Sequence, residues 1–193
     1  MESSTHQHDF RDCVTGNVSA PRERILALGG FDARFAGYGR EDYELGYRLQ
    51  RAGMRFVYEP RAVGLHRYRK PLTSWLRQSR SIGHADVLFA RLHPEIAGEV
   101  MTLSSYPFVP FRGPLVAIAE AVAHRRNRAG GWLWKKAAAY AQSAHYWSGI
   151  RDAVDDRAEL AHLLRVQQER KSRAGRISAR KRAYMAYAQW ALR

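Results

Sequence analysis

The sequence has a single cysteine among its 193 residues and no long apolar run. The one cysteine, Cys13, excludes an intrachain disulfide framework and a zinc site built from several cysteines. The longest apolar stretch, Leu115 to Ala123, is interrupted by Glu120 and is far shorter than the ~20 residues that a membrane span requires. The first twelve residues are polar and lack the apolar core of a secretory signal. We therefore expect a cytoplasmic protein.

Acidic residues are also scarce, because 18 Asp and Glu stand against 32 Lys and Arg, which leaves a net charge of +14. Such an excess predicts anionic partners, namely phosphate groups, nucleic acid or an anionic membrane surface. Charge alone does not choose among the three. Hydrophobic residues make up 46% of the chain, which is enough for a packed core.

The first part of the chain predicts two short helices, each followed by glycine. One helix is expected over residues 20–28, because a proline suits its first turn and Gly29 and Gly30 can end it. The other is expected over residues 40–52 and ends at Gly53. The loop between them is rich in glycine and aromatic residues and has no periodic pattern.

Residues 54–58 are rich in β-forming side chains and predict a short strand, and residues 62–66 have the composition of a second extended segment. The remainder is dominated by residues that favour helices. Helices are expected over residues 72–92, 115–126, 132–154, 155–171 and 177–192. We therefore expect strand and helix together in the first half and helices alone after it.

Three carboxylates, Glu41, Asp42 and Glu44, stand at the start of the second predicted helix. The N-terminus of a helix favours negative charge, and a carboxylate in the first turn faces a loop edge that a substrate can reach. If a sugar hydroxyl lies within hydrogen-bond distance, such a group can accept its proton. Acidic residues are also common in first helical turns without any catalytic role, so the pattern alone leaves both explanations open.

Three motifs in this region resemble glycosyltransferases of the GT-A fold: TGNVS at residues 15–19, GGFDARF at 29–35 and GYGREDYELGYRL at 37–49. The closest resemblance is to family 2 enzymes and the related galactosyltransferase C-terminal module, and it covers residues 13–95. It implies an α/β fold class in which residues 1–96 form the C-terminal, acceptor-side half of a Rossmann-like GT-A domain. Residues 97–193 would then be a mainly helical, basic extension.

The resemblance also assigns roles to individual residues. Asp42 matches the catalytic base, Glu41 matches the neighbouring carboxylate that holds the acceptor, and His66 matches a histidine that completes the metal site or touches the diphosphate. Substrate-binding roles are implied for Asn17, Gly29, Gly30, Phe31, Tyr38 and Arg67. Each also has a plainer explanation, since glycines end helices, loop aromatics serve as anchors, an asparagine stabilises turns and surface arginines are solvated.

Enzymes of this type transfer a sugar with inversion by direct displacement. The resemblance therefore implies a hexosyltransferase-class enzyme with a nucleotide-sugar donor and a hydroxyl acceptor on a carbohydrate, a lipid-linked molecule or a protein. A divalent metal, manganese or magnesium, is expected to steady the departing nucleotide diphosphate, because that leaving group needs positive charge aimed at it.

The metal-binding Asp-Xaa-Asp motif of the family is absent from the sequence. Only twelve residues precede the match at Cys13, whereas a nucleotide-binding half requires on the order of 100. We therefore expect a fragment, a split subunit or an inactive relic, and we expect metal binding only together with a separate N-terminal half.

Two rival functions follow from the charge. A nucleic-acid-binding protein would explain the Arg-rich stretch at residues 165–182, but the sequence has no zinc-finger spacing and no RNA-recognition aromatic signature. We therefore do not expect nucleic acid as a partner. A non-catalytic membrane-docking protein would use the basic helical tail, which could also hold an active enzyme peripherally on the inner membrane surface.

Overall fold

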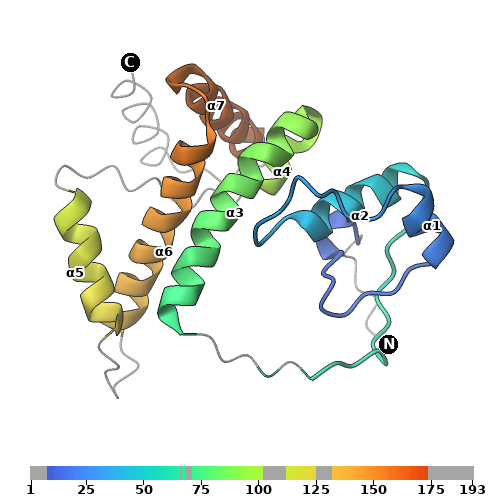
Figure 1. The fold of residues 1–193 in the computed structure, drawn as a ribbon, viewed down its shortest axis with the longest axis horizontal. Coiled ribbons are helices and arrows are strands. Elements are labelled where there is room, and N and C mark those ends of the chain that lie inside the picture. The colour runs from blue at the N-terminus through green and yellow to red at the C-terminus, as the bar shows by residue number, and fades with distance from the viewer. Residues whose placement is uncertain (1–7, 66, 68–70, 102–111, 125–131, 174–193) are drawn as a thin grey trace. The chain divides into compact units, whose positions relative to one another are not determined.

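The computed structural model describes residues 8–65, 67, 71–101, 112–124 and 132–173 (Figure 1). The chain forms two compact units, Met1–Arg69 and Lys70–Arg193. This division lies at a different position from the boundary that we predict after residue 96. Among the described residues, every regular element is a helix, and none of the helices is long and apolar enough to cross a membrane.

The N-terminal unit contains a short 3-10 helix, η1 (Phe10–Asp12), and two α-helices, α1 (Arg22–Ala27) and α2 (Glu41–Arg51). Both predicted helices of this region are confirmed to within two residues. Each is followed by glycine with positive φ, which L side chains rarely adopt.

The predicted strand at residues 54–58 is wrong for this structure, because the described part of the chain contains no strand. After α2 the backbone continues through residues 54–59 without helix or strand (Figure 1). β-forming side chains favour an extended backbone, but a strand is completed only by hydrogen bonds to a neighbouring strand. Nothing in the described structure tests the wider expectation of a partial GT-A fold, so that fold class stays a prediction.

The C-terminal unit is a helical assembly, coloured green to red-brown in Figure 1. Its elements are α3 (Leu72–Leu92), η2 (Pro94–Ile96), α4 (Ala97–Val100), α5 (Arg112–His124), α6 (Trp132–Ala153) and α7 (Arg157–Arg173). Helices α3 and α6 lie side by side, α5 packs on α6, and α4 packs on α7. The predicted helices of this half are confirmed to within three residues, and the one at 177–192 lies outside the described residues.

Two glycines allow α3 and α6 to pack backbone against backbone. A Cβ atom on Gly149 of α6 would lie 1.9 Å from the Arg80 carbonyl oxygen of α3. A Cβ atom on Gly83 of α3 would lie 2.2 Å from the Tyr146 carbonyl oxygen. Real Cβ atoms do not approach backbone so closely, so both positions require glycine.

The same contact buries apolar and polar groups together. Trp147, Ile150 and Val87 are fully buried in the core cluster between the helices. The Tyr146 hydroxyl donates a 2.5 Å hydrogen bond to the buried Asp86 carboxylate, which satisfies a polar pair that would otherwise be costly. Residues 72–92, which form α3, therefore belong to the helical unit.

Replacing Gly149 by alanine should destabilise the helical unit by about 1–3 kcal/mol or more, because the added methyl must force α3 and α6 apart. All five tryptophans lie in this unit, so chemical denaturation followed by tryptophan fluorescence reports on it alone. Gly113→Ala is the matched control, because nothing lies within 4 Å of its Cβ position. Equal stability of the two variants would contradict the close packing.

Candidate functional site

Asp42 lies in the first turn of α2 and is half-buried. Its Oδ1 accepts a 2.9 Å hydrogen bond from the Tyr43 backbone N–H. Burial raises the pKa of the Asp42 carboxyl and the charge of Glu41 raises it further, whereas the Tyr43 N–H lowers it. The net pKa is raised, so Asp42 is a stronger proton acceptor than an ordinary surface aspartate.

Glu41 is the first residue of α2 and precedes Asp42. Its Oε2 is buried and has no hydrogen-bond partner in the part of the chain that the structure describes. A buried carboxylate oxygen without a partner is costly, and such atoms concentrate at binding and catalytic sites. The two adjacent carboxylates therefore differ, since Asp42 is hydrogen-bonded by backbone and Glu41 retains an unused acceptor.

The backbone that leads into α2 has an unusual conformation. Gly39 has φ 108°, and Arg40 is the one described non-glycine residue with positive φ, at 71°. A left-handed conformation costs an arginine about 1–2 kcal/mol. The Arg40 guanidinium lies over the Tyr43 ring, 4.9 Å from its centroid, which offsets part of that cost. Strain of this kind is typical of functional sites, and the Arg40 charge lies close enough to Asp42 to lower its pKa.

The segment of η1 and Cys13 packs against α2 one helical turn after Asp42. A Cβ on Gly46 would lie 2.6 Å from Cys13 Cβ and 2.9 Å from the Phe10 carbonyl oxygen, so α2 rests directly on this segment. The Phe10 N–H also donates a 2.8 Å hydrogen bond to Gln50 of α2. Burial and the Asp42 charge raise the pKa of the Cys13 thiol, which keeps it protonated and unreactive.

A buried ion pair joins α2 to the turn that follows α1. Glu44 is 2% exposed, and its carboxylate accepts hydrogen bonds from Arg48 Nε, at 2.7 Å and 2.9 Å, and from Arg48 Nη2 at 2.7 Å. Arg48 also donates to the Leu28 and Gly30 carbonyl oxygens, each at 2.6 Å. The spacing of the pair was predictable from sequence, but its burial and its hold on the glycine turn were not.

The residues expected to bind substrate are distributed over the N-terminal unit. The turn at Gly29 and Gly30 is held to α2 through Arg48, and the side chain of Phe31 beside it is exposed. The Tyr38 side chain, just before α2, is exposed as well. These positions leave aromatic surface on the loop between α1 and α2, and their substrate-binding roles stay predictions.

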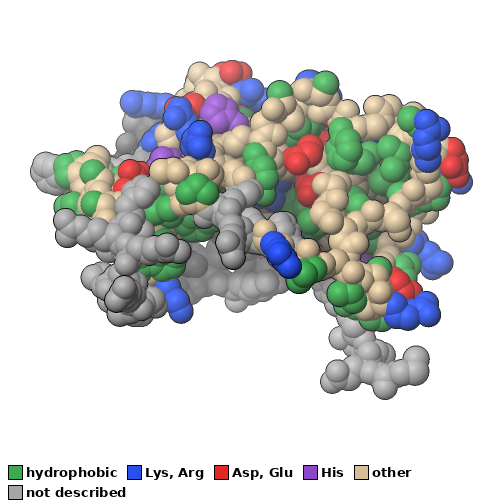
Figure 2. Space-filling view, turned by 60° about the horizontal axis from the view of Figure 1, so that its bottom comes forward, with side chains coloured by type: hydrophobic (Ala, Val, Ile, Leu, Met, Phe, Trp, Pro, Cys, Tyr) green, Lys and Arg blue, Asp and Glu red, His purple; other side chains and the backbone are tan. Residues whose placement is uncertain are grey.

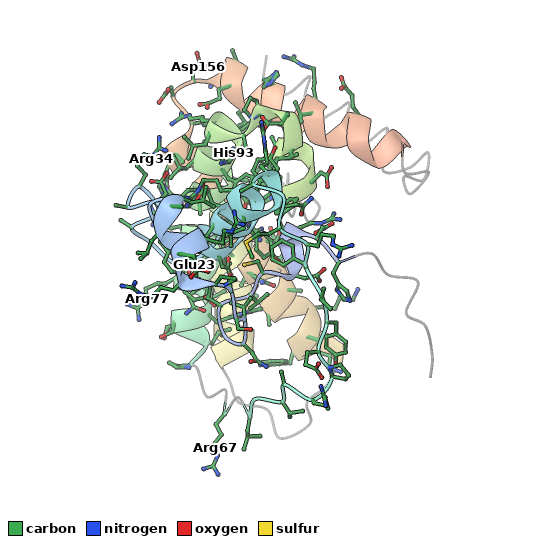
Figure 3. The ribbon with its side chains drawn as sticks, turned by 90° about the vertical axis from the view of Figure 1, so that its right-hand side faces the viewer. Glu23, Arg34, Arg67, Arg77, His93 and Asp156 are labelled. Carbon is green, nitrogen blue, oxygen red and sulfur yellow. The ribbon has the colours of Figure 1, made fainter. Side chains whose placement is uncertain are left out.

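Asn17 and Arg67 are placed differently. The Asn17 side-chain amide donates a 2.8 Å hydrogen bond to the Ala62 carbonyl oxygen, so it ties two loops together. This contact is the structural role that the sequence left open for Asn17 beside sugar binding. Arg67 is exposed and extends away from α1 and α2 (Figure 3). His66 lies outside the described residues, so its expected contact with metal or diphosphate stays a prediction.

No group of three or more His, Cys, Asp or Glu side chains in the described ranges could hold a metal ion. The described residues therefore do not supply the expected manganese or magnesium site. Lys and Arg side chains stand in small groups among acidic, polar and apolar ones on the face shown in Figure 2.

Two features of this site were not predicted from the sequence: the close packing of Cys13 on Gly46, and the left-handed backbone of Arg40 just before α2. A glycine inside a predicted helix is a sign of close packing, so Gly46 could have been found. The positive φ of Arg40 has no sequence signal, because arginine rarely adopts that conformation.

Removing the Arg48 side chain should destabilise the N-terminal unit by about 3–5 kcal/mol, because Arg48→Ala removes the guanidinium that hydrogen-bonds the buried Glu44 carboxylate. Hydrogen exchange of the α2 backbone amides in the full chain measures this effect locally. Arg24→Ala, an exposed change on α1, should leave the exchange almost unchanged. Equal protection in both variants would rule out the buried pair as a stabilising contact.

Asp42→Asn should stabilise the folded chain at neutral pH. Because folding raises the pKa of Asp42, its ionisation favours the unfolded state, and this penalty appears as pH rises through the folded pKa. The advantage of asparagine should disappear below the ordinary aspartate pKa of 3.8, where the carboxyl is protonated in both states. Hydrogen exchange of the α2 amides, measured for both proteins at neutral pH and below pH 3.8, checks the direction of this effect. Weaker protection of Asp42→Asn than of the native chain at neutral pH would contradict it.

Comparison with known proteins bears on this same segment. The family model for the N-terminal domain of galactosyltransferase matches residues 1–71. The chain is 40% identical over 57 residues to an uncharacterized glycosyltransferase, YfnE, of Bacillus subtilis (strain 168), a match that covers 30% of this chain. It is 43% identical over 51 residues, 26% of this chain, to the validoxylamine A glucosyltransferases of Streptomyces hygroscopicus subsp. jinggangensis (strain 5008) and subsp. limoneus.

The matches are local. They span 14% of the Bacillus protein and 12% and 11% of the two Streptomyces proteins. No solved structure matches the chain significantly. The family is described as an N-terminal domain, so the match supports the galactosyltransferase resemblance but not the C-terminal half or family 2, which stay predictions. At family level, the segment that contains α1 and α2 is related to glycosyltransferases.

Proposed function

We propose that this chain supplies the acceptor side of an inverting, nucleotide-sugar-dependent glycosyltransferase, with Asp42 as its catalytic base. The observation that carries the proposal is the position of Asp42. It is a half-buried aspartate with a raised pKa, in the first turn of a helix that lies inside the segment matched by the galactosyltransferase family. Surface capping alone would need neither the burial nor the strained entry at Arg40.

The chemistry asked of Asp42 is proton removal from an acceptor hydroxyl. As the hydroxyl oxygen bonds to the anomeric carbon of the donor sugar, its proton passes to the Asp42 carboxylate. The bond from that carbon to the nucleotide diphosphate breaks, and its electron pair leaves with the diphosphate. Attack on the face opposite the leaving group inverts the anomeric configuration. A base with a raised pKa contributes about 10²–10⁴-fold to such a step.

Glu41 has a different part in the proposal. Its buried Oε2 has no hydrogen-bond partner among the described residues and would accept a hydrogen bond from a second acceptor hydroxyl. Phe31 and Tyr38 offer exposed aromatic faces on the loop that joins α1 to α2. Together they suit a hydroxyl-rich acceptor, whether a carbohydrate, a lipid-linked molecule or a glycosylated protein.

The expected divalent metal stays a prediction. Attachment of the basic helical unit to an anionic membrane surface is proposed on charge alone: the chain carries a net charge of +14. Such attachment would bring lipid-linked acceptors to the site.

In an enzyme preparation that contains this chain together with a nucleotide-binding half, Asp42→Asn should lower the rate of sugar transfer by about 10²–10⁴-fold. Calorimetric titration with UDP and GDP should give unchanged affinity, because Asp42 is assigned to the acceptor. Glu23→Gln, an exposed carboxylate of α1, should keep full activity. Near-normal turnover of Asp42→Asn would end the assignment.

A further inference from the structure

The segment that follows α2 exposes apolar side chains on an open backbone. Val57 is 83% exposed, and its neighbour Tyr58 is exposed as well. The Met54 N–H bonds to the Leu49 carbonyl oxygen, and the next backbone bond along the chain runs from the Ala62 N–H to the Glu59 carbonyl oxygen. Within the described structure, the backbone groups of residues 55–58 have no backbone partner. Such a backbone is a template for strand pairing.

Both ends of this segment are held. The Met54–Leu49 bond of 3.1 Å fixes its start to the end of α2. The Asn17 side chain holds the Ala62 carbonyl oxygen at 2.8 Å beyond its end, and the Tyr58 ring stacks on His8 with centroids 5.9 Å apart. Because the segment is already held in place, pairing with a partner loses less conformational entropy than ordering a free loop would.

The residues of the segment are self-complementary. The sequence from 55 to 59 is Arg-Phe-Val-Tyr-Glu. If two copies run antiparallel with Val57 opposite Val57, Arg55 stands opposite Glu59 of the other copy, and this happens twice. Phe56 then stands opposite Tyr58 on the other face. Opposite charges and aromatic pairs directly across an antiparallel ladder are the favourable combinations.

We propose that residues 55–59 form an antiparallel two-stranded ladder with the same residues of a second copy of this chain. The interface is isologous, with its two-fold axis at Val57. It completes the strand that the β-forming composition of residues 54–58 predicts and that a single chain cannot make alone. This inference does not depend on the proposed sugar transfer.

One contact within the chain competes with the interface. Glu59 pairs with Arg61 at 2.9 Å, and both side chains are exposed. Exposed pairs are weak, so Glu59 can exchange Arg61 for Arg55 of the second copy. A five-residue ladder is smaller than the about 1,000 Å² of a stable interface, so we expect a dissociation constant on the order of 10⁻⁴ M.

Disulfide trapping tests the position of the axis. In Val57→Cys the two new thiols would face each other with Cα atoms about 4.5–5.5 Å apart, within the range of a disulfide. Oxidised glutathione should therefore convert this variant to a covalent dimer. Val63→Cys is the matched control, because Val63 is 86% exposed but lies outside the ladder. The native Cys13 is buried and should not react. No dimer, or equal dimer in both variants, would overturn the proposal.

Charge reversal tests the register. Sedimentation equilibrium of the full chain should show a weak monomer–dimer equilibrium. Arg55→Glu and Glu59→Arg should each weaken it by about tenfold, because each places like charges opposite one another twice. The double variant restores both pairs and should regain the dimer. A chain that stays monomeric would overturn the proposal. A dimer that charge reversal does not weaken would overturn it as well, and would show that the chain dimerises through another surface.

Discussion

The N-terminal unit depends on the buried pair of Glu44 and Arg48. The Arg48 guanidinium donates hydrogen bonds to both oxygens of the Glu44 carboxylate, which is 2% exposed, and these bonds offset the cost of burying it. The same guanidinium holds two carbonyl oxygens of the turn after α1, so one side chain joins a helix, a turn and a buried charge. The glycine turn keeps its left-handed backbone, and the first turn of α2 keeps a fixed place beside it. The position of Asp42 is a consequence of this arrangement.

Burial acts on Asp42 in two opposite ways. It makes the carboxyl a better proton acceptor, and it makes the ionised form destabilising to the fold. The same trade-off recurs at Arg40, whose left-handed backbone is unfavourable but places its side chain over Tyr43 at the edge of the site. Gly46 allows α2 to lie close to η1 beneath Asp42. A segment that served only to cap a helix would have no reason to accept these costs together.

The helical unit is organised by a different constraint, which is the contact of α3 and α6 at Gly83 and Gly149. At these two positions the backbones approach so closely that no side chain fits between them. This packing makes α3 part of the second unit. The motif resemblance reaches residue 95, whereas the family model ends at residue 71, near the division between the two units at Arg69 and Lys70. The physical boundary of packing thus lies close to the boundary of detectable relationship.

The sequence by itself determined the helices, since periodic apolar residues and terminal glycines are local signals, and through its resemblance to glycosyltransferases it predicted roles for Asp42 and Glu41. It predicted a strand at residues 54–58 that the described structure does not contain, because a ladder needs a partner strand that local composition does not supply. Only the tertiary structure decided that Glu44 is buried, that Asn17 ties a loop to Ala62, and that Arg40 is strained. Each of these depends on residues distant in sequence or on a backbone conformation that arginine rarely adopts, and burial and strain are properties of packing.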